Sequence, residues 1–435
     1  MSAKKKVDVI TMGCSKNLCD SERLLSQLSR AGYDVEHNPR NVNGDIVVIN
    51  TCGFIGDAKE ESIEMIFDVL SLKKKKKVEK VFVMGCLSQR YLNDLKEEIP
   101  EVDGWFGKFD WDGITKTLNA DIPEIICHPY ERILTGPSHY AYLKISEGCN
   151  RKCAFCAIPL ITGPHQSRRK EDLLDEVKGL VDKGVKEFNV IAQDLSSYGL
   201  DLYRHQALPE LIDSMSQIAG VEWIRLHYAY PAQFPEELLD VMASRDNVCK
   251  YLDIALQHVS DKVLSNMRRH ITGNETVELI EKIRKKVPDI HFRTTLMVGF
   301  PGEGEKEFDE LLDFVGKTKF ERMGAFAYCE EEDTFAAQNF QDCISEEVKQ
   351  ERLERLLDLQ EGISLEVHKS KIGKSFNTII DREEDDFYVG RTQWDSPEVD
   401  PEVLIKKDRA LKTGDFYNVT VTSVQPFELY GVVND

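Results

Sequence analysis

Three cysteines that could act as metal ligands stand close together in the sequence, at Cys149, Cys153 and Cys156. They form a Cys-x3-Cys-x2-Cys triplet directly after the apolar segment 140–145. Cysteine thiolates hold iron–sulfur clusters, and a cubane with four irons normally takes four of them. Three thiolates leave one iron without a protein ligand, and an open coordination position is typical of a catalytic metal site. The triplet therefore indicates a [4Fe-4S] cluster with one open iron.

A zinc knuckle, or three buried thiols without any ligand, is the alternative interpretation of this triplet. A closed zinc site would need a fourth ligand, and the nearby candidate is His165. Its spacing from Cys156, across Pro159, Gly163 and Pro164, matches no common zinc motif. We therefore favour the iron–sulfur interpretation.

A second set of cysteines is dispersed through the first third of the chain. Cys14, Cys52 and Cys86 each follow a strand-like segment, and helical patterns over 17–31 and 57–72 separate these segments. The strand-like segments are Val7–Met12, Asp45–Ile49 and Lys80–Met84. Alternating strands and helices indicate a parallel sheet, and the carboxyl ends of such strands converge where ligands bind. A single free cysteine is most simply a small buried residue, but three at equivalent strand ends favour a second three-thiolate cluster.

The bulk composition narrows the class of protein. The chain has 435 residues, of which 41% are hydrophobic, and a formal net charge of -20. This length predicts two to four domains, and the acidic charge disfavours non-specific nucleic-acid binding. We expect a cytoplasmic protein, because the sequence has neither a signal-peptide pattern nor an apolar run of 18 residues. In such a chain, eleven cysteines favour metal ligation over disulfides.

A Pro- and Gly-containing linker from Asp121 to Ser138 marks a domain boundary. Beyond it, strand and helix patterns alternate. The predicted strands are Tyr140–Ser146, Glu187–Ala192, Trp223–Tyr228, Leu252–Gln257, Phe292–Gly299 and Gly324–Tyr328. Six units of this kind predict a partial (βα)6 barrel, in which function gathers at the carboxyl ends of the strands.

The end of the chain has a different pattern. The apolar residues of 345–368 recur at helical spacing. Short strand-like pieces with turns follow over 369–435, as expected for a small β-barrel. We therefore expect an α/β protein with four parts: a three-cysteine sheet domain over 1–122, a partial barrel over 138–343, a linking helix over 344–368 and a β-barrel over 369–435.

The triplet, with Phe155 just before its last cysteine, resembles the signature of radical S-adenosylmethionine (SAM) enzymes. Along its whole length the chain resembles the methylthiotransferases of that superfamily, which combine a three-cysteine domain, a radical SAM domain and a C-terminal barrel of the TRAM type. The resemblance implies SAM and two [4Fe-4S] clusters as cofactors.

Individual positions carry over from this resemblance. Phe155 would shield the cluster and touch the adenine of SAM, with core packing as its alternative role. Gln193 and Asp194 match the place where the family holds the amino group of SAM. Gln257 and His258 would face the ribose or the substrate, although His258 could equally be a hydrogen-bonded structural histidine.

Two branches of the family differ in substrate. One modifies an adenosine in transfer RNA, and the other modifies an aspartate of the small-subunit ribosomal protein numbered twelve. Residues 369–435 contain 9 Lys and Arg against 13 Asp and Glu, a net charge of -4. Such a barrel would repel RNA and could bind a basic ribosomal protein. The segments that resemble the ribosomal-protein branch are 13–18, 144–149, 156–159, 390–392 and 395–399, whereas Thr162 departs from it where arginine is common.

We therefore expect a methylthiotransferase of the ribosomal-protein branch. The resemblance implies that one SAM methylates sulfur at the Cys14, Cys52 and Cys86 cluster. It also implies that a second SAM is cleaved at the triplet cluster, and that the resulting radical removes hydrogen from the aspartate β-carbon. An electron-donor protein is an implied partner, and we expect a monomer without direct nucleic-acid binding. The alternatives are methylthiolation of transfer RNA and a non-catalytic iron–sulfur scaffold that binds the ribosome.

Overall fold

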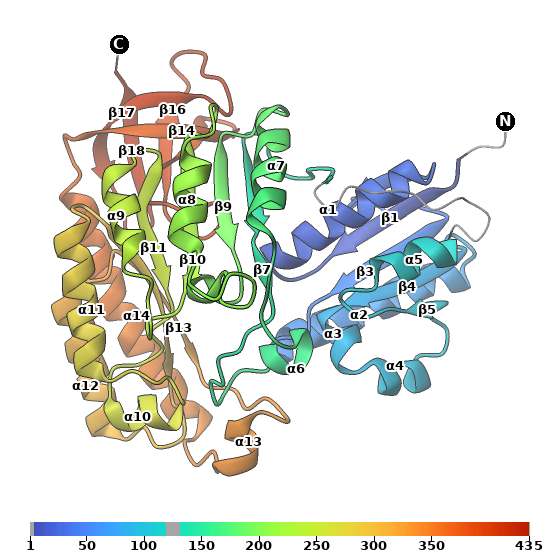
Figure 1. Ribbon diagram of the computed structural model, residues 1–435, viewed down its shortest axis with the longest axis horizontal. Helices are drawn as coiled ribbons and strands as arrows, with labels where there is room; N and C mark the ends of the chain where they lie inside the picture. The colour runs from blue at the N-terminus through green and yellow to red at the C-terminus, as the bar shows by residue number, and fades with distance from the viewer. Residues whose placement is uncertain (1–3, 119–130, 435) are drawn as a thin grey trace. The chain divides into compact units, whose positions relative to one another are not determined.

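The computed structural model describes residues 4–118 and 131–434 (Figure 1). These residues form two compact units. The first contains the chain up to Gly136 together with Tyr142–Arg151 and Cys156–Glu176, and the second contains Pro137–Ala141, Lys152–Phe155 and everything after Val177. Most of the predicted linker, up to residue 130, lies outside the described residues.

The first unit is built on a five-stranded parallel sheet in the order β2-β1-β3-β4-β5. Its strands are β1 (Lys6–Thr11), β2 (Asp34–His37), β3 (Ile46–Thr51), β4 (Lys80–Gly85) and β5 (Gly104–Trp105), and its helices are α1 (Ser15–Arg30), α2 (Gly56–Lys74), α3 (Cys86–Arg90), α4 (Leu92–Glu98) and α5 (Trp111–Leu118). The predicted parallel sheet is confirmed. The strands β2 and β5 were not predicted from the sequence, because they are short edge strands with weak apolar patterns.

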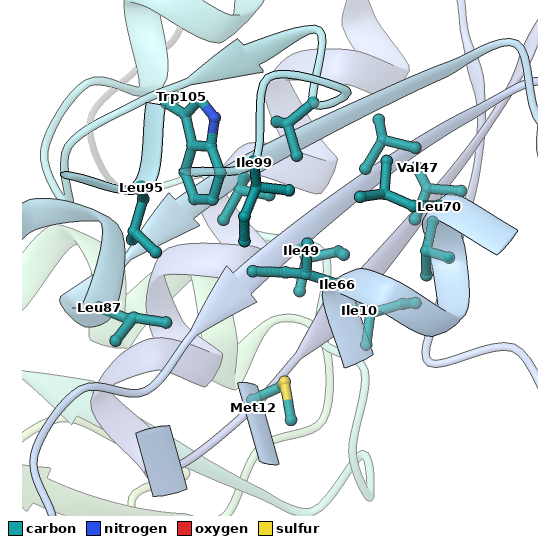
Figure 2. Close-up of a cluster of buried hydrophobic side chains, with 14 of the residues drawn as sticks. Ile10, Met12, Val47, Ile49, Ile66, Leu70, Leu87, Leu95, Ile99 and Trp105 are labelled. Atoms are coloured by element: carbon teal, nitrogen blue, oxygen red, sulfur yellow. The ribbon is translucent and has the colours of Figure 1, made fainter. Parts of the chain in front are cut away.

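Alternate residues of the central strands point to opposite faces of this sheet, because side chains in a strand have a period of two. Val47 and Ile49 of β3 pack with Ile66 and Leu70 of α2 on one face, where Figure 2 shows the cluster. The neighbouring residues of β3 and β4 pack against α1 and α5 on the other face. Cores on both faces bury the sheet and fix the positions of the strand ends.

The middle part of the chain has a six-stranded sheet in the order β13-β12-β11-β10-β9-β6, so the six predicted strands are confirmed. The strands are β6 (Tyr140–Lys144), β9 (Glu187–Ile191), β10 (Trp223–Ala229), β11 (Val248–Ile254), β12 (His291–Val298) and β13 (Arg322–Ala327). The accompanying helices are α7 (Lys170–Val181), η1 (Leu195–Ser197), α8 (Leu208–Ser216), α9 (Glu237–Ser244), α10 (Asp261–Asn266), α11 (Gly273–Lys286), α12 (Glu305–Thr318) and α13 (Phe335–Asn339).

Two strand predictions differ from the structure by more than one residue at their carboxyl ends. β11 ends at Ile254 rather than Gln257, and Gln257, with a positive φ of 73°, forms only an isolated bridge to Leu296. β6 ends at Lys144, and the next two residues form a separate strand, β7 (Ser146–Glu147), which pairs antiparallel with β8 (Gln166–Ser167). This short pairing closes the base of the loop that carries the cysteine triplet.

The predicted linking helix is α14 (Glu346–Lys369), with Ser345 as its N-cap. It leads into a closed barrel in the order β14-β15-β16-β18-β17. Its strands are β14 (Ser375–Glu383), β15 (Phe387–Thr392), β16 (Glu402–Lys406), β17 (Phe416–Val424) and β18 (Glu428–Val433). The predicted small C-terminal β-barrel is therefore confirmed.

The C-terminal barrel packs on the ends where strands β9 to β13 begin (Figure 1). Trp223, the first residue of β10, meets Phe416 of β17 with ring centroids 4.8 Å apart. Arg322, the first residue of β13, forms a buried ion pair with Asp395. The barrel therefore covers the end of the sheet opposite to the carboxyl ends where function gathers. Part of its acidity is thus neutralised within the protein.

Candidate functional site

The three dispersed cysteines follow adjacent strands of the N-terminal sheet. Cys14 comes three residues after β1, Cys52 directly after β3, and Cys86 directly after β4. The strands β1, β3 and β4 are neighbours, and Thr51 is in register with Gly85. The predicted convergence of strand ends is thus present in the structure.

Two glycines let these strand ends approach one another. Gly13 has φ of 85°, and a Cβ there would lie 2.9 Å from Sγ of Cys52. Gly85 has φ of 107°, and a Cβ there would overlap the backbone of Thr51. Both positions need glycine, because its φ range and missing Cβ allow the left-handed turn and the close contact. The glycines therefore bring the cysteine-bearing turns together.

Asn17 of α1 ties the same turns together with its side chain. Its Nδ2 donates to the carbonyl oxygens of Met12 and Thr51, both at 3.0 Å, and so joins the ends of β1 and β3. Its Oδ1 accepts from Sγ of Cys86 at 3.6 Å and from Nζ of Lys108 at 3.1 Å. Asn17 was not predicted from the sequence, because an asparagine on a helix has no distinguishing local pattern.

The thiols interact electrostatically with one another and with nearby lysines. Burial raises the pKa of Cys86 to about 11, although Lys108 opposes the shift. Burial also raises the pKa of Cys52, and the negative charge of Cys14 adds to this effect. Burial opposes ionisation of Cys14 as well, but Lys16, Lys108 and backbone N–H donors outweigh it and lower the pKa of Cys14. A bound cation would favour all three thiolates, because metal ligands bind deprotonated.

Two cysteines of the triplet lie in the same unit as this site. The backbone N–H of Cys149 donates to the carbonyl oxygen of Gly163 at 3.2 Å, which folds the loop back on itself. Cys156 precedes α6 (Ile158–Thr162), and Ile161 of that helix packs against Cys86. The Cys156 segment is therefore in direct contact with one of the three strand-end cysteines.

Cys153, in the second unit, lies beside two polar side chains. Nη1 of Arg269 donates to its Sγ at 3.3 Å, and the hydroxyl of Tyr230 lies 3.9 Å from it. The guanidinium of Arg269 stacks over the Tyr230 ring at 4.2 Å, and the same hydroxyl donates to the backbone oxygen of Arg269 at 2.7 Å. Neither residue belongs to a recognisable motif, so the sequence analysis missed both.

Phe155 is half-buried and packs against an apolar cluster that includes Met267 and Phe300. Its ring meets that of Phe300 edge-on, with centroids 6.3 Å apart. These contacts support the core-packing role, and they leave the predicted contact with adenine as a prediction.

Gln193 and Asp194 follow β9 at its carboxyl end, as expected. The Asp194 carboxylate accepts from the backbone N–H of Ser196 at 2.9 Å and from the hydroxyl of Ser197 at 2.6 Å. It thereby caps the short helix η1 and fixes the loop after β9. The predicted contact of Gln193 and Asp194 with SAM stays a prediction.

Gln257 has two unusual features at the carboxyl end of the sheet. Its φ of 73° is strained for a residue with a side chain, and its backbone still bonds to Thr295 and Met297 at 2.9 and 2.8 Å. Its Oε1 is buried without a hydrogen-bond partner among the described residues. Strain and an unsatisfied buried acceptor mark functional sites. The Gln257 side chain therefore fits a donor on a bound cofactor.

His258 is fully buried, and both of its ring nitrogens have partners. Nδ1 accepts from the backbone N–H of Ser260 at 2.9 Å, so Nε2 carries the proton and donates to Glu303 at 3.2 Å. The Glu303 carboxylate also accepts hydrogen bonds from the guanidinium of Arg352 on α14 and from the backbone N–H of Gly299. These bonds support the structural role for His258, which holds the 299–303 loop.

The zinc alternative gains no support from the structure. Among the residues that the structure describes, no three His, Cys, Asp or Glu side chains are arranged to hold one metal ion. Nε2 of His165 bonds instead to the hydroxyl of Ser167 at 3.0 Å. A cubane cluster spaces its thiolates more widely than a zinc ion, because each thiolate binds a different iron. The predicted cluster ligands stay predictions.

Three family profiles match successive parts of the chain. Residues 6–107 match the uncharacterized protein family UPF0004, residues 143–315 match the radical SAM superfamily, and residues 372–433 match the TRAM domain. A "Ribosomal protein uS12 methylthiotransferase RimO" from Parabacteroides distasonis is 59% identical over 99% of both chains. The protein of that name from Cytophaga hutchinsonii is 48% identical over 99% of this chain and 98% of its own.

This chain belongs to the RimO family of radical SAM methylthiotransferases. Among solved structures, TsrM from Kitasatospora setae covers 95% of this chain with a TM-score of 0.56 at 14% identity, and 84% of that chain is covered. OxsB covers 83% of this chain with a TM-score of 0.54 at 13% identity, and 56% of that chain is covered. These two structures show the fold alone. Among the described residues, no helix has the length and apolar character needed to cross a membrane.

Proposed function

We propose that this RimO-family chain adds a methylthio group to the β-carbon of an aspartate in ribosomal protein uS12, using SAM and two [4Fe-4S] clusters. The observation that carries the proposal is the 59% identity to relatives named as uS12 methylthiotransferases, over 99% of both chains. The strand-end convergence of Cys14, Cys52 and Cys86 supports a second sulfur-bearing site in addition to the radical triplet.

The six cysteines would bind two separate clusters. Cys149, Cys153 and Cys156 would hold one cluster, and the dispersed cysteines would hold the other. When bound, the clusters and SAM would supply a radical that removes hydrogen from an unactivated C–H bond. They would also supply the methylated sulfur that replaces this hydrogen.

The protein's own groups would fix these cofactors in place. Arg269 would hold the Cys153 side chain in position through its 3.3 Å hydrogen bond to Sγ. The unsatisfied Oε1 of Gln257 would accept a hydrogen bond from the amino group or a ribose hydroxyl of SAM. His258, Glu303 and Arg352 would hold the 299–303 loop rigid.

We also propose the partners and location that this chemistry requires. A protein electron donor would reduce the clusters, and the enzyme would act as a monomer. It would act in the cytoplasm, because its substrate is a ribosomal protein. The exposed acidic turn 383–386 of the C-terminal barrel is charged to attract a basic protein and to repel RNA. We retain the division at residues 122, 138, 343 and 369 as our proposed domain limits.

Mass spectrometry of uS12 from a deletion strain tests the substrate. We expect uS12 to lose the mass of a methylthio group, and complementation with the wild-type chain to restore it. Loss of a methylthio group from transfer RNA alone would contradict the proposal and support the RNA alternative.

Anaerobic reconstitution tests the clusters. We expect about eight irons per chain, from two clusters of four, and SAM cleavage that Cys153→Ala abolishes. Persistent SAM cleavage by Cys153→Ala would contradict the radical assignment, and about four irons in the wild type would contradict the second cluster.

A further inference from the structure

A chain of alternating charges, of which Asp20, Lys108 and Lys144 are buried, runs through the first unit. Asp20 of α1 is 1% exposed, and one of its oxygens accepts from Nζ of Lys108 at 3.0 Å. Its other oxygen pairs with Lys144 of β6, which also pairs with Glu147. Glu147 stands two residues before Cys149. The charges therefore reach from the strand-end cysteines to the loop that begins the triplet.

Lys108 is the member of this chain that faces the three strand-end cysteines. Its side chain is 2% exposed, and its Nζ donates to Oδ1 of Asn17 at 3.1 Å. The same oxygen accepts from Sγ of Cys86. The positive charge of Lys108 also acts on Cys14 and Cys52, so one ammonium group serves all three thiols.

A buried ammonium group is costly unless its partners compensate for lost hydration. Here the compensation is shared, because Asp20 also pairs with Lys144. Lys108 is therefore only partly neutralised by its own ion pair. The remaining positive field is directed at a site where three thiolates would bring negative charge.

We propose that Lys108 is a positioning residue that supplies the counter-charge for an anionic cluster held by Cys14, Cys52 and Cys86, and that Asp20 limits how much of that charge the cluster experiences. This inference rests on the proposed second cluster. Three thiolates on a [4Fe-4S]²⁺ core give a net charge of about -1, and reduction makes it more negative. A nearby cation favours the reduced form, so Lys108 raises the reduction potential.

Variants of Lys108 and Asp20 should shift the potential in opposite directions. Lys108→Met removes the cation and makes reduction harder, so the midpoint potential becomes more negative. Asp20→Asn removes the opposing anion and makes the potential more positive. Lys108→Arg keeps the charge and should restore a value near that of the parent. A purely structural role would predict no such reversal of sign.

The measurement uses the full chain with Cys149, Cys153 and Cys156 changed to alanine, so that iron binds only at the strand-end site. Each variant is reconstituted, its iron is counted, and the cluster is titrated redox-potentiometrically with electron paramagnetic resonance as the readout. Four irons per chain in the parent are expected.

An unchanged potential in fully loaded Lys108→Met overturns the inference, as do shifts of the same sign in Lys108→Met and Asp20→Asn. If Lys108→Met does not fold, the positive shift of Asp20→Asn and the unchanged potential of Lys108→Arg still decide the question. Absence of iron from the parent overturns the second cluster itself, which distinguishes failure of the proposed function from failure of this inference.

Discussion

Arg391 of β15 donates to Glu187, the first residue of β9, with Nη2 2.7 Å from Oε2 and both side chains buried. Arg391 also forms an ion pair with Asp381, and Glu187 forms a second ion pair with Arg225. Burial opposes ionisation of Glu187, but Arg391 and Arg225 outweigh it and lower its pKa. These contacts join the C-terminal barrel to the radical SAM sheet, so the Gly390-Arg391-Thr392 segment has a structural function.

Arg391→Met should therefore destabilise the protein strongly. Removing one partner of a buried pair leaves uncompensated charge and costs about 3–5 kcal/mol. The matched control is Arg382→Met, which breaks an ion pair of a 46% exposed arginine with Glu402 and should cost about 0–1 kcal/mol. Urea unfolding measures both, and equal losses would contradict a special role for Arg391.

Lys371 gives a prediction about pH. Its Nζ is buried without a hydrogen-bond partner among the described residues and lies 5.1 Å from the Trp394 ring centroid. Burial lowers the pKa of Lys371 from 10.5 to about 8, although Asp395 opposes the shift. Below pH 8 the folded protein must hold a charged, buried amine, and this cost is relieved as pH rises from 8 to 10.5, because only the unfolded chain is then protonated.

Lys371→Met should accordingly be more stable than wild type at pH 7, by up to roughly 3 kcal/mol. The difference should shrink as pH approaches 10.5. Exposed Lys374→Met is the control and should leave the pH dependence unchanged. Denaturant midpoints across this pH range provide the check, and a constant difference would show that burial of the Lys371 charge is not the cause.

Gly85→Ala should damage the strand-end cysteine site. Its φ of 107° and its contact with the Thr51 backbone leave no room for a Cβ, so the turn that carries Cys86 must move. We expect reconstituted iron to fall from about eight to about four per chain, with SAM cleavage at the triplet retained. Gly179→Ala is the control, since a Cβ there meets nothing within 4 Å. Full iron loading of Gly85→Ala would refute the prediction.

Gln257→Asn should weaken SAM binding without loss of fold. Asparagine tolerates a positive φ but is shorter, so its amide would no longer reach a cofactor donor. Losing a hydrogen bond to a charged group costs about 1.5–3 kcal/mol, or roughly tenfold or more in affinity. Equilibrium dialysis of SAM against the reconstituted enzyme measures this, with exposed Gln338→Asn as the control. Unchanged affinity would exclude Gln257 as a direct contact.

The strands and helices that carry the cysteines could be predicted because their patterns are local. Apolar runs ending at Gly13, Asn50 and Gly85 predicted β1, β3 and β4, and helical spacing predicted α1 and α2. Short edge strands such as β5 were missed, because two residues carry too little periodicity to recognise. The strained turn at Gln257 was also missed, because its positive φ is maintained by bonds to Thr295 and Met297 rather than by its own sequence.

The sequence by itself determined the chemistry, since the number and spacing of cysteines can be recognised without a fold. Only the tertiary structure decided which charges surround those cysteines. Lys108, Asp20 and Lys144 are far apart in the chain and meet because buried charges must find partners. Tertiary packing also decided that several acidic groups of the C-terminal barrel pair within the protein. Net charge sums over the sequence, whereas the field at a site depends on distances that only folding creates.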